Sequence, residues 1–229
     1  MVVNQTPPDL ALIIFDWDGT LIDSEANIVA CLNAMIQDLG LPSRPHAALS
    51  NIIGLGLIES LTMLFPDHSR KDYEGMIDRY RYHFFSSEPS QPFPGAEQVL
   101  TELGKRGYFL AVATGKGRRG LDKALDSSGF RQHFHITRCA DETRSKPHPL
   151  MLEEILDELG MEPHQALMVG DTEYDLQMAG HARMWGLGVS YGVHEPDRLK
   201  QCQPVAIISE ISELLSWLDG EEIAARRDE

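Results

Sequence analysis

Six short, mostly apolar runs recur along the chain, and the first of them, LALIIF at residues 10–15, has no polar position. An uninterrupted apolar run of this length is typical of a strand buried on both faces, as in parallel sheets. The other five runs occupy residues 108–114, 134–139, 166–171, 186–190 and 205–208. Amphipathic helical patterns separate most of these runs, and most of the patterns end at a glycine suited to a helix C-terminus. The alternation predicts an α/β fold with a doubly wound parallel sheet.

The interval from about residue 22 to residue 91 breaks this alternation, because one helical pattern follows another there. The stretch SSEPSQPFPG closes the interval, and its serines and prolines favour a hinge. We therefore expect two domains. Residues 1–21 and 92–229 would form a Rossmann-like core, and residues 22–91 a smaller all-helical domain over the carboxyl edge of the sheet.

The composition indicates an ordinary soluble protein whose partners are not polyanions. The chain has 229 residues, and its 20 Lys and Arg against 35 Asp and Glu give a formal charge of -15, which repels nucleic acid and anionic membranes. No apolar run approaches the ~18 residues of a membrane span. The N-terminal MVVNQTPPDL lacks the basic and apolar regions of a signal peptide. We expect a cytoplasmic protein without nucleic-acid or membrane partners, as a monomer or a homodimer.

Polar side chains that suit catalysis follow four of the apolar runs. In chain order they are Asp16 with Asp18, Thr114, Lys146, and Asp171 with Asp175. Because the carboxyl ends of parallel strands share one edge, where ligands bind in such sheets, we expect four carboxylates, one ammonium and one hydroxyl to converge there. Closely spaced carboxylates require a cation, and all-oxygen ligation favours Mg²⁺ before Ca²⁺. Mg²⁺ and a lysine together attract an anion with several oxygens, such as a phosphate group.

The same residues are suited to transfer a phosphoryl group. A carboxylate such as Asp16 is a competent nucleophile toward phosphorus and would form an acyl phosphate. Asp18 is placed to protonate the leaving oxygen and later to deprotonate water. Thr114 and nearby backbone N–H groups would hold the phosphoryl oxygens, and Lys146 would neutralise their charge. The substrate expected from this pattern is a small phosphorylated metabolite.

Four motifs carry a family resemblance. DWDGTLIDS, the Thr of VATGK, the Lys of SKPHP, and GDTEYD resemble, in this order, the four motifs of the haloacid dehalogenase superfamily. The helical insertion resembles its C1-type cap, and within the superfamily the chain most resembles phosphoglycolate-phosphatase-like enzymes. The implied catalytic residues are Asp16, Asp18 and Lys146. The implied Mg²⁺ ligands are Asp16, Asp18 through its backbone carbonyl, Asp171, and Asp175 directly or through water. The implied phosphate ligands are Thr114, the backbone amide of Gly115, and Lys146.

Other positions near these motifs are less specific. The second motif reads Thr-Gly where many relatives have Ser or Thr followed by Asn, so a side-chain donor is lost at Gly115. Gly54 and Gly56 precede a helical pattern, and they either offer N–H groups to a substrate carboxylate or form an ordinary turn. The cations after the second motif are expected to form a solvated helix start, with contact to substrate or cap as the alternative. They are Lys116, Arg118 and Arg119.

Individual residues favour or disfavour several activities related to that of a phosphatase. The resemblance implies a phosphatase, and Asp18 argues against a dehalogenase or a phosphonate hydrolase. A β-phosphoglucomutase-like enzyme usually has a His shortly after the first motif. The corresponding stretch of this chain, SEANIVACLN, has no His, so a mutase is the less favoured alternative. A nucleotidase or pyrophosphatase stays open, because cap residues decide the substrate. A non-catalytic binding module would be expected to have lost the nucleophile, the acid or the lysine, and none is lost.

Overall fold

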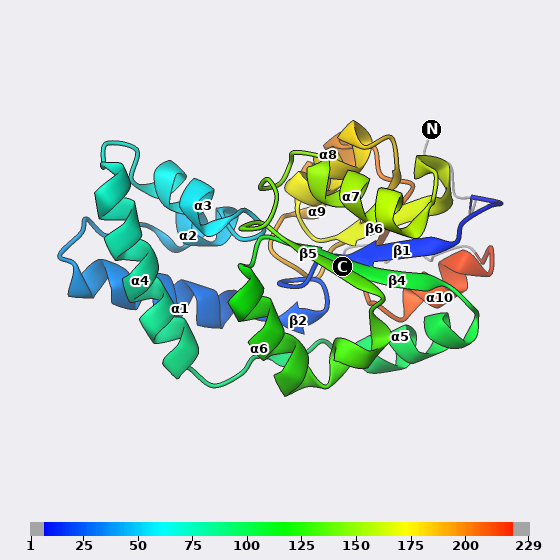
Figure 1. The fold of residues 1–229 in the computed structure, drawn as a ribbon, viewed down its shortest axis with the longest axis horizontal. Coiled ribbons are helices and arrows are strands. Elements are labelled where there is room, and N and C mark those ends of the chain that lie inside the picture. The colour runs from blue at the N-terminus through cyan, green and yellow to red at the C-terminus, as the bar shows by residue number, and fades with distance from the viewer. Residues whose placement is uncertain (1–6, 222–229) are drawn as a thin grey trace, which may run out of the picture.

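The structure, a computed structural model, describes residues 7–221, so part of the N-terminal MVVNQTPPDL and residues 222–229 lie outside it. Its centre is a six-stranded parallel sheet with the strand order β5-β4-β1-β6-β7-β8 (Figure 1). The strands are β1 (Leu12–Phe15), β4 (Phe109–Thr114), β5 (Ile136–Cys139), β6 (Ala166–Gly170), β7 (Trp185–Val189) and β8 (Ala206–Ile208). The chain runs outward from β1 on one side and from β6 on the other, which confirms the predicted doubly wound sheet. The crevice of such a sheet lies beyond the carboxyl ends of the strands where the order reverses.

Helices cover both faces of the sheet because successive strand residues face opposite sides. Ile13 and Phe15 belong to an apolar cluster with α5 (Ala96–Lys105), α6 (Arg118–Ser128) and α10 (Glu213–Leu218). Leu12 and Ile14 belong to a second cluster with α7 (Leu150–Leu159) and α8 (Glu173–His181). Helix α9 (Pro196–Gln201) packs against β7 and β8. The sheet is therefore buried on both faces, and its strand ends are held rigidly.

Four helices, which we call the helical segment, lie beside the sheet rather than on either of its faces (Figure 1). They are α1 (Glu25–Asp38), α2 (His46–Asn51), α3 (Leu57–Leu64) and α4 (Arg70–Ser86). The two-residue strands β2 (Ile22–Asp23) and β3 (Gln91–Pro92) pair antiparallel, so the chain enters and leaves the segment at one place. Buried residues such as Leu32 and Leu61 give the segment an apolar cluster formed chiefly by its own side chains.

All six predicted strands are present, and the elements missed from sequence are short. Helices α9 and α10 have six residues each, and η1 (Phe130–His133) and η2 (Pro163–Gln165) are single 3₁₀ turns. Fewer than two helical turns are too few to show an apolar periodicity. Among the helices of residues 7–221, none has the length and the apolar character needed to cross a membrane.

Candidate active site

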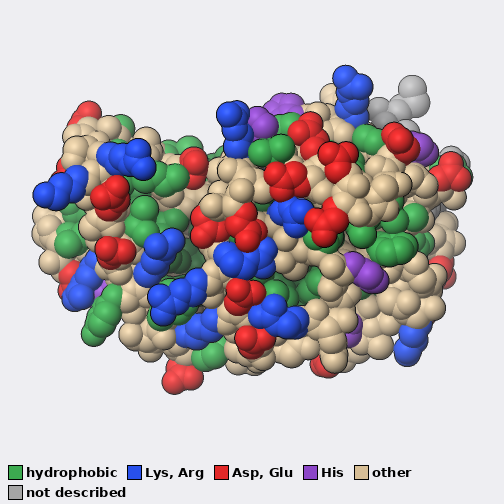
Figure 2. Space-filling view, viewed as in Figure 1, with side chains coloured by type: hydrophobic (Ala, Val, Ile, Leu, Met, Phe, Trp, Pro, Cys, Tyr) green, Lys and Arg blue, Asp and Glu red, His purple; other side chains and the backbone are tan. Residues whose placement is uncertain are grey.

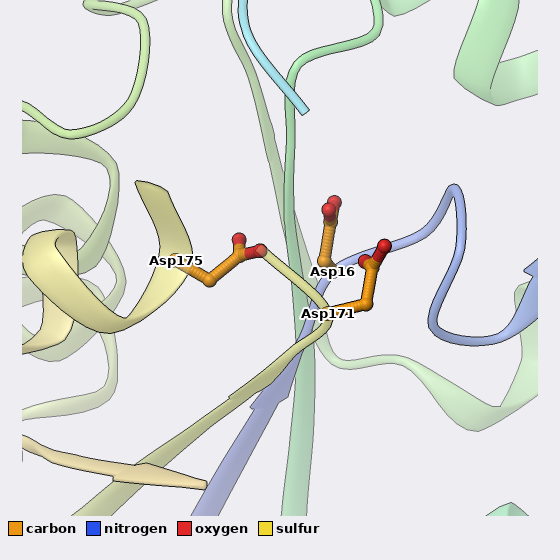
Figure 3. A group of neighbouring side chains, drawn as sticks. All are labelled: Asp16, Asp171 and Asp175. Carbon is orange, nitrogen blue, oxygen red and sulfur yellow. The ribbon is translucent and has the colours of Figure 1, made fainter. Parts of the chain in front are cut away.

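The sequence-predicted residues lie beyond the carboxyl ends of neighbouring strands. Asp16 follows β1, Asp171 follows β6, and Asp175 lies in the first turn of α8. Their three carboxylates are directed into one space (Figure 3), and each offers an oxygen within 4.8 Å of the others. All three side chains are buried. We call these residues and Lys146, which reaches into the same space, the carboxylate centre.

Lys146 neutralises part of the negative charge of this centre. Its Nζ atom lies 2.7 Å from Oδ1 of Asp16 and 2.6 Å from Oδ1 of Asp175, and its side chain is fully buried. Burial alone would lower the pKa of Lys146, but the two carboxylates raise it above its ordinary value. The lysine is therefore a permanent cation that links β1 to α8.

Asp16 is held by one oxygen only. Its Oδ1 atom accepts the Trp17 N–H at 2.6 Å in addition to facing Lys146. Its Oδ2 atom is buried and has no hydrogen-bond partner among residues 7–221. Burial raises the pKa of Asp16, and Lys146 opposes that shift. A buried carboxylate oxygen without a partner is costly, so Oδ2 is directed to a ligand or to a reacting atom.

Asp171 is tightly enclosed. Its Oδ1 accepts from Thr20 Oγ1 at 2.9 Å and its Oδ2 from the Val193 N–H at 2.8 Å. A Cβ atom on Gly19 or on Gly192 would lie 2.2 Å from an atom of Asp171, so only glycine fits at either position. Burial, and then the charge of Asp175, raise the pKa of Asp171 to about 7. The chain thus packs its backbone around a carboxylate that a nearby cation would help to ionise.

Asp175 divides its two oxygens between the helix and the lysine. Its Oδ2 accepts from the N–H and Oγ1 of Thr172 at 3.1 and 2.6 Å, which forms a capping box at the start of α8. Its Oδ1 faces Lys146. Asp175 therefore caps the start of α8 and also faces the buried cation of the centre.

The oxygen-rich centre suits a hard divalent cation. Three buried carboxylates face one another with a single lysine among them, and one oxygen of Asp16 has no partner in the described chain. Neither His nor Cys belongs to this group, and oxygen ligands favour Mg²⁺ over softer metals. The residues present therefore fit such an ion.

Asp18 does not join the other carboxylates, although convergence of all four was expected. Its Oδ1 accepts from Ser24 Oγ at 2.6 Å and lies 3.0 Å from Lys116 Nζ. The Lys116 ammonium also lies 4.5 Å from the centre of the Phe84 ring in α4. Lys116 is thus almost buried against Asp18 and the helical segment, and the favoured solvated helix start is wrong for it.

The two arginines beyond Lys116 make structural contacts. Arg118 pairs with Glu142 at 2.7 Å, and the Arg119 guanidinium lies over the Phe85 ring of α4. Charge alone does not distinguish the three cations of the sequence, Lys116, Arg118 and Arg119, from one another. One feature of the sequence could have indicated the role of Lys116. It follows Thr114, the last residue of β4, by two positions, so its backbone lies near the edge of the sheet where the carboxylates gather.

Comparisons with known proteins now bear on this arrangement. A family model described as haloacid dehalogenase-like hydrolase matches residues 13–189, well over half of the chain. The chain belongs to this family. Its residues 13–189 contain the whole carboxylate centre and the helical segment, and the membership predicted from the four motifs is confirmed.

Individual relatives of this haloacid dehalogenase-like hydrolase align over nearly its whole length. It is 33% identical over 213 residues to the probable phosphatase IndB of Dickeya dadantii, which covers 89% of this chain and 91% of the relative. It is 30% identical to the phosphoglycolate phosphatase of Psychrobacter arcticus, over 92% and 96% of the two chains. A haloacid dehalogenase-like family hydrolase of Streptococcus pneumoniae has the same fold, with a TM-score of 0.80, 24% identity, and coverage of 91% and 98%.

The second motif of this hydrolase lies directly under the helical segment. Thr114 is buried at the end of β4, and its Oγ1 accepts the Lys116 N–H at 3.2 Å. A Cβ atom on Gly115 would lie 2.4 Å from the carbonyl oxygen of Leu55 and 2.5 Å from that of Gly54. The replacement of Asn by Gly in this motif therefore lets the segment come into backbone contact with the core.

The glycines of the helical segment take part in the same contact. Gly54 adopts a left-handed conformation (φ 97°) beside Thr172. The Gly56 N–H donates to Ser145 Oγ at 2.7 Å. In this structure its hydrogen-bond partner is therefore a side chain of the core, at the place expected for a substrate carboxylate. The segment is thus docked on the loops that carry Lys146 and Asp171.

Proposed function

We propose that this protein hydrolyses a small phosphomonoester in a Mg²⁺-dependent reaction that passes through an aspartyl phosphate on Asp16. The observation that carries the proposal is the asymmetry of Asp16. Its Oδ1 is fixed by Lys146 and by the Trp17 N–H, whereas its buried Oδ2 is without a partner in the described chain. A carboxylate held in this way is oriented as a nucleophile.

The proposed reaction has two displacements. In the first, Oδ2 of Asp16 forms a bond to phosphorus, the bond from phosphorus to the leaving oxygen breaks, and Asp18 gives that oxygen its proton. In the second, Asp18 takes a proton from water, the water oxygen bonds to phosphorus, and the bond to Asp16 breaks. Lys146, Thr114 and the Gly115 amide would bind the phosphoryl oxygens and stabilise their charge.

The proposed Mg²⁺ ligands are Asp16, the backbone carbonyl of Asp18, Asp171 and Asp175. The ion would supply positive charge to the phosphoryl oxygens. The backbone at Gly19 and Gly192 encloses Asp171 and so fixes the direction of this proposed ligand's carboxylate.

We further propose that residues 22–91 act as a cap domain on a core of residues 1–21 and 92–229. The antiparallel pair of β2 and β3 would be the hinge, and closure would exclude bulk water from the phosphoryl group. Gly54 and Gly56 would help to define the substrate, because they dock beside the centre. The proposal includes a cytoplasmic location and a phosphorylated metabolite as substrate. Relatives named phosphoglycolate phosphatase make phosphoglycolate the first compound to test.

The proposal is tested with p-nitrophenyl phosphate as a generic substrate. Asp16→Asn should reduce the rate by roughly 10⁴-fold or more, the scale expected for loss of a nucleophile. EDTA should abolish the activity and added Mg²⁺ should restore it. The matched control is Asp9→Asn, because Asp9 is exposed and precedes the opposite, amino end of β1. Activity that survives either Asp16→Asn or EDTA would refute the mechanism.

A further inference from the structure

A cavity of ≈ 210 Å³ lies between the helical segment and the core. Asp18, Gly115 and Lys116 line it on the core side. Most of its remaining lining is apolar and comes from α1, α4 and the loop before α3, including Ile28, Leu32, Ile53, Ile77, Tyr80 and Phe84. Figure 2 shows hydrophobic side chains recessed among Lys and Arg side chains where the segment meets the sheet.

The position of the cavity indicates which part of the substrate it would hold, namely the leaving group. Asp18 lines it, whereas Asp16, Lys146 and Asp171 do not. In the proposed reaction Asp18 protonates the leaving oxygen, and the other three hold the phosphoryl group or the cation. The group attached to the leaving oxygen therefore extends into this cavity.

The size of the cavity exceeds what a two-carbon leaving group fills. A cavity of about 150 Å³ lined by Leu, Ile and Phe binds benzene in an engineered lysozyme. The present space is larger, and the rings of Tyr80 and Phe84 are stacked in its wall at 6.0 Å with 17° between their planes. A glycolate group would leave most of the apolar wall in contact with water.

The charge of the lining also disfavours a second anionic group. Its ionisable residues are three acids and three bases, namely Asp18, Glu59, Asp141, Arg81, Lys116 and Arg119. Lys116 already pairs with Asp18, and Arg119 lies over the Phe85 ring. The formal charges of the lining sum to zero with Asp18 ionised and to +1 with Asp18 carrying the proton that it donates, so at most one charge is left to offset a substrate carboxylate.

We propose that the preferred substrate is a phosphomonoester whose leaving group carries an uncharged ring of about six members. This inference rests on the proposed function, since it needs the phosphoryl group at Asp16. It separates this chain from enzymes that select phosphoglycolate, which carries a carboxylate in addition to its phosphate.

Three alkyl phosphates with alkoxide leaving groups of similar basicity test the proposal: benzyl phosphate, ethyl phosphate and phosphoglycolate. The kcat/KM for benzyl phosphate should exceed that for ethyl phosphate by at least about 100-fold, because a single buried methylene already contributes roughly tenfold or more. It should also exceed that for phosphoglycolate by at least about tenfold. Hydrolysis of phosphoglycolate at an equal or higher kcat/KM would overturn the substrate class and leave the phosphatase function intact. Failure to hydrolyse any of the three or p-nitrophenyl phosphate with Mg²⁺ would refute the function itself.

Variants of the wall locate the ring. Ile77→Phe should lower the ratio of kcat/KM for benzyl over ethyl phosphate by about tenfold, because it fills the cavity. Leu41→Phe is the matched control, since Leu41 packs against the same apolar cluster without lining the cavity, and its ratio should not change. Ile77→Ala keeps the test decisive if the larger side chain prevents folding, because it should improve naphthylmethyl over benzyl phosphate. An unchanged ratio in folded Ile77 variants would show that the ring binds elsewhere.

Discussion

The carboxylate centre and the interface between the helical segment and the core are built in different ways. In the centre, charged side chains stand directly after strands and are fixed by Lys146, by backbone N–H groups and by glycines. At the interface, a loop of the segment contacts Gly115, and single contacts such as Lys116 with Phe84 join the loop before α6 to α4.

This difference separates the residues that would carry out phosphoryl transfer from those that would select the substrate. The groups of the centre are buried and mutually paired, so removal of one leaves an uncompensated charge. The interface contacts are single hydrogen bonds and ring contacts, such as Gly56 with Ser145 and Lys116 with Phe84, so they are able to break when the segment opens. The centre is expected to tolerate no change, whereas the interface should tolerate graded change.

Removal of Lys146 should have the largest effect. Lys146→Met leaves Asp16 and Asp175 unpaired in the interior, and breaking a buried ion pair costs about 3–5 kcal/mol of stability. The loss in the free energy of unfolding should grow as the pH rises above the ordinary carboxyl range, because Asp16, whose pKa burial raises, then has to ionise without its cation. Urea unfolding at pH 5 and pH 8 measures it, with Lys105→Met, an exposed lysine of α5, as the control. A loss as small as that of the control would show that the carboxylates are compensated elsewhere.

Protons and Mg²⁺ should compete for Asp171. Burial raises its pKa from 3.8 to about 7, so folding of the metal-free protein becomes less favourable as the pH rises from about 4 to about 7, and not further above. Below pH 7, Mg²⁺ binding must displace one proton, and its affinity should fall about tenfold per pH unit. Titration calorimetry between pH 8 and pH 5 measures this fall. A constant affinity would mean that Asp171 is not a ligand.

The centre was predictable from sequence because its geometry is local. Asp16 and Asp171 immediately follow apolar runs, and neighbouring parallel strands bring their carboxyl ends to one edge. Each of these two positions therefore needed only the end of its own strand. The side-chain direction of Asp18 was not predictable, because the turn after β1 aims it at Ser24 and Lys116 rather than at the other carboxylates.

The interface was not predictable for the opposite reason. The departure at Gly115 was visible in the sequence, but its cause is the carbonyl group of Leu55, which arrives from a separate part of the chain. The position of Lys116 likewise depends on how α4 docks against the start of α6. Contacts of this kind follow from tertiary packing and leave no periodic pattern.

Lys116→Met should show that an interface residue affects the catalytic step through its contact with Asp18. The change removes the cation that holds Asp18, so kcat/KM, which reports the steps up to the first displacement, should fall by about 10- to 100-fold, within the range of a general acid. The fall should be larger for benzyl than for p-nitrophenyl phosphate, because nitrophenolate leaves without protonation. Lys123→Met is the control, since Lys123 contacts the Phe85 carbonyl and not Asp18. Equal losses on both substrates would exclude a role through Asp18.

Gly115→Asn restores the residue of many relatives and should push the segment from the core. Its Cβ would enter the space of the Leu55 carbonyl oxygen, and overpacking of this kind costs about 1–3 kcal/mol. The value of kcat/KM should therefore fall roughly tenfold, since opening relieves the clash. Gly104→Ala is the control, because nothing lies within 4 Å of a Cβ there. Wild-type activity in Gly115→Asn would show that the close docking is dispensable.

The smallest effect is expected at Asn51, where the end of α2 meets the core. Its backbone carbonyl accepts from Tyr174 Oη at 2.9 Å, and its side-chain oxygen accepts from Arg198 at 2.7 Å. Asn51→Ala removes the second bond, worth about 1 kcal/mol, together with the long contacts from Nδ2 to Tyr174 Oη at 3.5 Å and Met63 Sδ at 3.9 Å. KM should therefore rise two- to fivefold, by rough conversion, with kcat unchanged. Asn33→Ala, a half-buried position of α1, is the control. A double-mutant cycle with Arg198→Ala should return a coupling of about 1 kcal/mol. A tenfold fall in kcat would instead place Asn51 with the carboxylate centre, and the division between the two regions would fail.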